Sequence, residues 1–163
     1  MRLFRHLFAP STARMFPEAS VQRIADAIAE GERRHRGEVC FAVEAALPPA
    51  AVWAGMDARA RALEVFSQLR VWDTEANNGV LLYLLLADHR IEIVADRGFH
   101  DRVGADDWRA ICAAIEQRLR AGRAEEAVLH GIAAITDCVA RHFPRAEGEH
   151  DHNELPDRPH VLR

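Results

Sequence analysis

One segment constrains the fold more than any other. From Gly79 to Ala87 the chain is apolar at every position, with no alternation between apolar and polar residues. A strand with one solvent-exposed face alternates, whereas a strand covered on both faces does not. We therefore expect this segment to form the central strand of a sheet that has helices on both sides.

The flanking residues predict the elements around that strand. Strands are expected at 38–47, where Pro48 and Pro49 stop the first one, and at 90–96, which alternates and should be half exposed. Helices are expected from Pro17 to Gly37, from an Asp57 cap through a stripe of Leu63, Phe66 and Leu69, from an Asp106 cap to Gly122, and from there to Pro144.

The order of these elements predicts the fold class. A strand, a crossover helix and a second strand in sequence should give a parallel, right-handed unit, and the 90–96 strand should return antiparallel. We expect an α/β protein, a three-layer α/β/α sandwich with a small mixed sheet of three recognisable strands. Residues 1–16 form an N-terminal segment, 17–144 the domain and 145–163 a flexible, loosely ordered C-terminal tail.

Composition removes several classes of function. The net charge of −4 offers no basic face for nucleic acid. All 21 basic residues are arginine, so lysine-based Schiff-base and phosphate-loop chemistry is absent. The three cysteines lie inside apolar segments, which favours buried, reduced thiols. No transmembrane segment or signal peptide is evident, and we expect a cytoplasmic protein.

Oxygen-bearing side chains gather at one predicted edge of the sheet. If strands 80–87 and 90–96 are antiparallel, the start of the first and the end of the second meet at that edge. Such ligands suit a hard cation, calcium or magnesium. The alternative is that they form turns, helix caps and solvated loops. The candidate metal ligands are Asp73, Glu75, Asn77, Asn78, Asp96, Asp101 and Asp106.

Three further features have two readings each. Arg97 could bind an anion such as phosphate, or neutralise the neighbouring Asp96. The run His150-Asp151-His152 could hold a transition metal, or be solvated. The four apolar residues Leu3, Phe4, Leu7 and Phe8 could contact a membrane surface or a partner protein.

The central segment also resembles a known family, the TPM domain, named for a thylakoid lumen protein, a photosystem repair protein and a worm receptor modulator. The likeness extends over roughly Pro17 to Pro144. The residues that carry it are Asn78-Gly79-Val80-Leu81, Asp88-His89-Arg90, the returning strand Ile91 to Asp96 with Gly98, and Asp106 at the start of a helix.

The resemblance implies a Rossmann-like α/β/α sandwich with four strands and a calcium site in an acidic cleft between loops. It also implies a role beside a membrane protein complex, in assembly or quality control, and, as the alternative, a metal-assisted acid phosphatase. Two positions depart from the family pattern. Asn77 stands where members often carry an acid, and Asp96-Arg97-Gly98 replaces a glycine-aromatic-glycine sequence.

Overall fold

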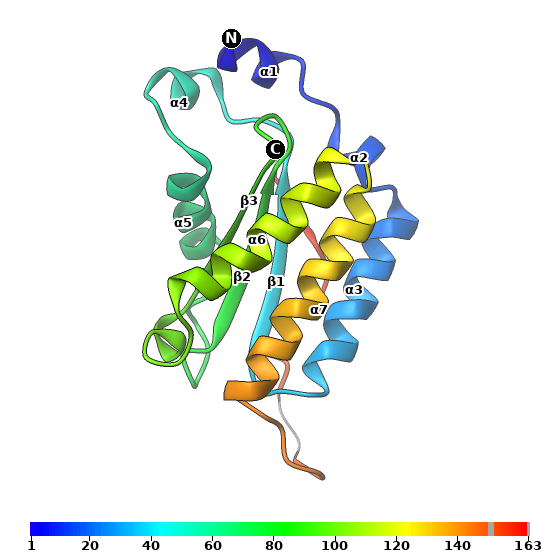
Figure 1. Cartoon of the computed structure of the whole chain (residues 1–163), viewed down its shortest axis with the longest axis vertical. Helices are drawn as coiled ribbons and strands as arrows, with labels where there is room; N and C mark the ends of the chain where they lie inside the picture. The colour runs from blue at the N-terminus through cyan, green and yellow to red at the C-terminus, as the bar shows by residue number, and fades with distance from the viewer. Residues whose placement is uncertain (150–151, 163) are drawn as a thin grey trace.

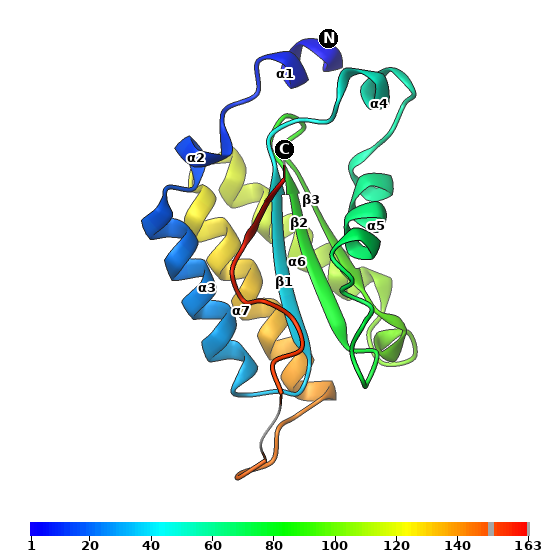
Figure 2. The same cartoon turned by 180° about the vertical axis from the view of Figure 1, so that it is seen from behind.

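The computed structural model describes residues 1–149 and 152–162 and shows a four-stranded sheet between two layers of helices (Figures 1 and 2). The strands are β1 (Glu38–Glu44), β2 (Gly79–Leu85), β3 (Arg90–Ala95) and β4 (His160–Leu162), in the order β3-β2-β1-β4. The helices are α1 (Arg2–Leu7), α2 (Thr12–Met15), α3 (Glu18–Glu32), α4 (Pro49–Trp53), α5 (Ala58–Gln68), the 3-10 turn η1 (Arg97–Phe99), α6 (Ala105–Arg120) and α7 (Ala124–His142).

The sheet is mixed, as the sequence predicts. β1 pairs with β2 in parallel, and β2 pairs with β3 in the antiparallel direction. α3, α6 and α7 cover one face of the sheet, and α5 covers the other (Figures 1 and 2). The predicted fold class, a three-layer α/β sandwich, is therefore confirmed.

β2 is the centre of the molecule. All seven of its residues are buried, which confirms the interpretation of the uninterrupted apolar segment. Val80, Leu82 and Leu84 pack against the three-helix layer, while Leu81 and Tyr83 pack on the side of α5. Because both faces are covered, an apolar residue is stabilising at every position of this strand.

The fourth strand comes from the tail, where the sequence predicted no ordered structure. His160, Val161 and Leu162 pair in parallel with the end of β1, and Leu155 is buried before them. The prediction of a loosely ordered tail is therefore wrong for this segment. The sequence gives no signal for this strand, because three residues are too few to show the alternation of apolar and polar residues. His150 and Asp151 of the proposed metal run lie outside the described residues.

Two details of the helices differ from expectation. Leu63 is 48% exposed, and α5 instead buries Ala58, Ala62 and Val65. The small side chains of Ala58 and Ala62 let this helix lie close to the sheet. The close packing that results outweighs the burial of the larger Leu63 side chain. α6 starts at Ala105, and the carboxylate of Asp107 accepts the backbone N–H of Gly104 at 3.0 Å. Asp106 is therefore in the first turn and is not the cap.

No described helix combines the length and the apolar character that crossing a bilayer requires.

Candidate functional site

The loop before β2 and the loop after β3 are hydrogen-bonded to each other. The backbone N–H of Asp96 donates to the carbonyl of Gly79 at 2.9 Å, and that of Gly98 donates to the carbonyl of Asn77 at 2.9 Å. Residues 77–79 and 96–98 thus form one junction at the end of the sheet, where the antiparallel pairing of β2 and β3 places them.

Local conformation explains the residues found in this junction. Asn77 has φ of 52°, a left-handed conformation that asparagine tolerates better than most residues. Its neighbour Asn78 is 1% exposed; its Nδ2 donates to the carbonyl of Arg36 at 2.9 Å, and its backbone N–H donates to Thr74 Oγ1 at 3.1 Å. The first contact fixes the Asn78 side chain, and the second fixes its backbone.

The close approach of the two loops leads to a prediction for Gly98. A Cβ atom at this position would lie 2.4 Å from the carbonyl oxygen of Asn77, so Gly98→Ala must push the loops apart. We expect a loss of about 1–3 kcal/mol in the free energy of unfolding, measured by urea denaturation. Gly104→Ala is the control, because its nearest atom is 3.4 Å away and belongs to the Asp107 side chain. Equal losses in both variants would contradict the close packing.

Two oxygen atoms of the junction are buried without a hydrogen-bond donor. They are Asn78 Oδ1 and Asp96 Oδ2, and neither has a partner among the described residues. The other carboxylate oxygen of Asp96 accepts the backbone N–H of Arg97 at 2.7 Å. A buried oxygen without a donor is destabilising by about 1–3 kcal/mol, so both atoms favour a ligand that accepts their lone pairs.

The other candidate ligands do not join this junction. Asp73 forms an exposed ion pair with Arg70, at 2.6 Å, and Asp106 pairs with Arg109 on the surface of α6. The side chains of Glu75, Asp101 and Arg97 are exposed. Within residues 1–149 and 152–162 there is no group of three or more histidine, cysteine, aspartate or glutamate side chains placed to hold a metal ion.

A buried acidic cluster beside the junction was not predicted. The carboxylate of Glu38, which is 3% exposed, accepts the backbone N–H groups of Glu154 and Leu155 at 3.1 and 3.2 Å. Glu32 accepts the N–H of Val39 at 2.9 Å. Burial, together with the nearby charges of Glu38 and Asp157, raises the pKa of Glu32 to about 9. These acids hold the tail against the sheet.

A second buried polar group lies at the other end of β1, around Glu44, also without a signal in the sequence. Arg61 binds both oxygens of Glu44 at 2.9 and 3.0 Å, and the Tyr83 hydroxyl donates to Glu44 Oε2 at 2.6 Å. Burial, followed by the Glu44 hydrogen bond, raises the pKa of Tyr83. Glu44 is 1% exposed, so this group stabilises the fold and is closed to a substrate.

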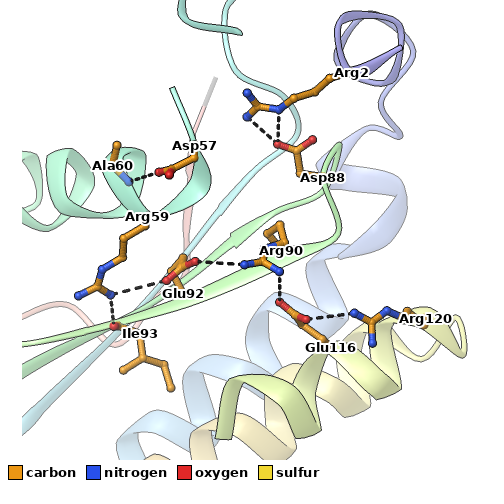
Figure 3. A network of polar contacts seen from close by, with 10 residues as sticks. All are labelled: Arg2, Asp57, Arg59, Ala60, Asp88, Arg90, Glu92, Ile93, Glu116 and Arg120. Atoms are coloured by element: carbon orange, nitrogen blue, oxygen red, sulfur yellow. Dashed lines mark hydrogen bonds and ion pairs between the residues drawn. The ribbon is translucent and has the colours of Figure 1, made fainter. Parts of the chain in front are cut away.

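Arginines cover the open edge of β3 (Figure 3). Arg59 donates to the carbonyl of Ile93 at 2.6 Å and lies 3.6 Å from Glu92. Arg90 reaches towards Glu92 and Glu116, at 4.0 and 3.6 Å. Charged side chains over an exposed edge protect it from pairing with another strand.

Cysteine offers no activated nucleophile. Burial raises the pKa of Cys40 to about 12 and that of Cys112 to about 11. Burial also raises the pKa of Cys138. All three thiols are therefore protonated at neutral pH, whereas nucleophilic cysteines require a lowered pKa.

A sizeable cavity lies at the other end of the sheet from the junction. It has a volume of about 620 Å³ and an apolar floor that includes Leu84 and Leu86. Arg5, Arg90 and Arg120 stand around it. Nothing in the sequence identified this hollow, because its wall combines the N-terminal segment, the β2–β3 turn and the end of α6.

Comparison with known proteins identifies similar molecules. The family model described as the TPM domain matches residues 11–138. No curated protein matches the sequence. The solved structure of the BA42 protein from the psychrophilic bacterium Bizionia argentinensis has a TM-score of 0.75 at 28% identity, over 93% of this chain and 95% of that one. The N-terminal domain of a P. gingivalis protein has a TM-score of 0.61 at 18% identity, over 87% of this chain and 85% of that one. At this low identity the likeness supports the fold alone.

Proposed function

Because the chain belongs to the TPM domain family, we propose that it is a binding module for a divalent cation, and that calcium binds at the junction of residues 77–79 and 96–98. The observation that supports the proposal is the pair of buried oxygens without donors, Asn78 Oδ1 and Asp96 Oδ2. Both belong to loops that the backbone hydrogen bonds hold together.

The donor set suits calcium better than a softer metal. Calcium accepts six to eight oxygen ligands from carboxylates, amides, backbone carbonyls and water, in flexible geometry. Asp96 would supply a carboxylate oxygen and Asn78 an amide oxygen. Magnesium also prefers oxygen, but it requires near-ideal octahedral geometry and retains most of its water, so we expect weaker binding.

The exposed acids would act at longer range. Asp73, Asp101 and Asp106 are exposed at the surface. Asp73 and Asp106 are each paired with an arginine and add little to the local potential, whereas Asp101 would raise the local concentration of cations without ligating one. In the cell, the bound cation would order the junction for contact with a membrane protein complex, the role that the family resemblance implied.

Calcium titration by calorimetry tests the site. We expect saturable binding to the wild-type protein, and an affinity lower by about tenfold or more for Asp96→Asn, which removes one charge of the ligand set and keeps the side-chain shape. Asp73→Asn is the matched control, since Asp73 pairs with Arg70 at the surface. An absence of binding in the wild type, or an equal loss in both variants, would contradict the proposal.

The same proteins separate binding from catalysis. The alternative function, a metal-assisted phosphatase, requires phosphate release from a generic phosphate ester that depends on calcium or magnesium. We expect no release above the level of the Asp96→Asn variant, since no described cysteine is activated and Arg97 is exposed to solvent. Release that falls in Asp96→Asn and in Arg97→Gln would support the phosphatase instead.

A further inference from the structure

The N-terminal helix α1 has its apolar residues on the outside. Met1, Phe4, Arg5 and Phe8 follow the spacing of one helix face, and this face is exposed to solvent. Phe4 is 66% and Phe8 is 80% exposed, whereas His6 on the opposite face is 6% exposed. A helix that only covers the core would show the reverse arrangement.

Polar contacts hold α1 in this orientation. Arg2 donates to Asp88 Oδ2 from Nε and Nη2 at 3.0 and 2.8 Å (Figure 3). His6 Nδ1 accepts the backbone N–H of Leu47 at 3.0 Å, and its Nε2 lies 3.2 Å from Asp88 Oδ1. The side chains that anchor α1 are thus the polar ones, which leaves Phe4 and Phe8 free.

A second exposed apolar element lies next to α1. α4 packs against α1 at the same end of the molecule, as both cartoons show (Figures 1 and 2), and its Trp53 is 84% exposed. Eight large apolar side chains are exposed in the described chain, and five of them are on these two elements or directly beside them. We name these five residues the apolar pole: Met1, Phe4, Leu7, Phe8 and Trp53.

The sequence segments that carry the apolar pole contain basic residues and no acid. The chain has a net charge of −4, yet residues 1–17 contain no acid and residues 45–56 contain no charged residue. Arg5 stands among the exposed apolar side chains, and its guanidinium makes no hydrogen bond or ion pair within the described part of the chain. Two acids nearby are engaged in contacts of their own: Asp88 is paired with Arg2, and Asp57 accepts the backbone N–H of Ala60 as the cap of α5.

We propose that the apolar pole docks onto the surface of a lipid bilayer that carries anionic headgroups. Phenylalanine, leucine and tryptophan enter the boundary between headgroups and acyl chains, and arginine pairs with the anionic headgroups above it. α1 and α4, which carry or flank these residues, lie at one tip of the molecule (Figures 1 and 2).

A second copy of the chain fits this surface less well. In a symmetric dimer the same patch meets itself, so Arg5 would face another arginine-bearing patch that contains no acid. Such an interface lacks charge complementarity, which anionic lipids provide. The proposal is independent of the calcium site, since the junction lies at the opposite end of the sheet.

Vesicle flotation with the full-length chain tests the proposal. We expect the wild-type protein to bind vesicles of phosphatidylcholine with phosphatidylglycerol, and to bind vesicles of phosphatidylcholine alone about fivefold or more weakly. Phe4→Ser with Phe8→Ser should reduce binding about tenfold or more. Trp72→Ser is the matched control, because Trp72 is 47% exposed outside the apolar pole. It should bind like the wild type.

Tryptophan fluorescence gives an independent readout on the same vesicles. We expect a blue shift of the emission on binding, which Trp53→Phe removes and Trp72→Phe retains. The proposal fails if the wild type does not bind anionic vesicles, or if the double serine variant binds them equally. It also fails if the only effect of that variant, in light scattering, is to dissociate a dimer, since the pole would then be an interface between copies.

Discussion

Replacing Arg61 with alanine should lower the free energy of unfolding by about 3–5 kcal/mol. The substitution leaves the Glu44 carboxylate buried at 1% exposure with only the Tyr83 hydroxyl as a hydrogen-bond donor from a side chain. An uncompensated buried charge costs far more than an exposed ion pair contributes. Urea unfolding followed by circular dichroism measures the loss.

Two further variants show whether charge is the cause. Arg109→Ala removes an exposed pair on α6 and should change stability by less than about 1 kcal/mol. Adding Glu44→Gln to Arg61→Ala removes the buried charge, so the double variant should recover part of the loss. A loss below about 1 kcal/mol for Arg61→Ala, or no recovery in the double variant, would contradict this account of the buried group.

Glu32→Gln should make the protein more stable at alkaline pH. The pKa of Glu32 rises from its ordinary value of 4.5 to about 9 in the fold, mainly through burial. Between these two values the native state binds more protons than the unfolded state, so this group lowers stability as the pH rises, by up to about 1.4 kcal/mol per pH unit. Glutamine is always neutral and can still accept the N–H of Val39.

The difference in the free energy of unfolding between Glu32→Gln and the wild type reports on Glu32, because the other titrating groups are the same in both proteins. Urea unfolding across the range between the two pKa values should show the variant gaining on the wild type at each step towards alkaline pH. Parallel curves for Glu32→Gln would show that its carboxyl is ionised in the native state.

The sequence predicted the elements that leave a local pattern of apolar, polar or capping residues. The buried β2, the returning β3 and the start of α5 at Asp57, whose side chain accepts the N–H of Ala60 at 2.7 Å, follow from patterns of neighbouring residues. β4 could not be predicted, because its three residues become a strand only by pairing with β1. Its formation is a tertiary effect.

The candidate site was predicted only in part, because only part of it follows from local sequence patterns. Antiparallel pairing of β2 and β3 was enough to bring residues 77–79 beside 96–98. It could not show that Asp73 and Asp106 would each find an arginine three residues away along the chain. Nor could it show that Glu32 and Glu38 are buried under the tail, because that contact joins residues more than a hundred positions apart.

The proposed cation site at the junction is tested most directly by following backbone amide signals in NMR during a calcium titration. We expect saturable shifts of Asn77, Asn78 and Gly79 together with Asp96, Arg97 and Gly98, while Phe4 and Phe8 in the apolar pole stay unchanged. Shifts confined to the exposed acids Asp101 and Asp106, or no saturable shift at all, would contradict a calcium site at the junction.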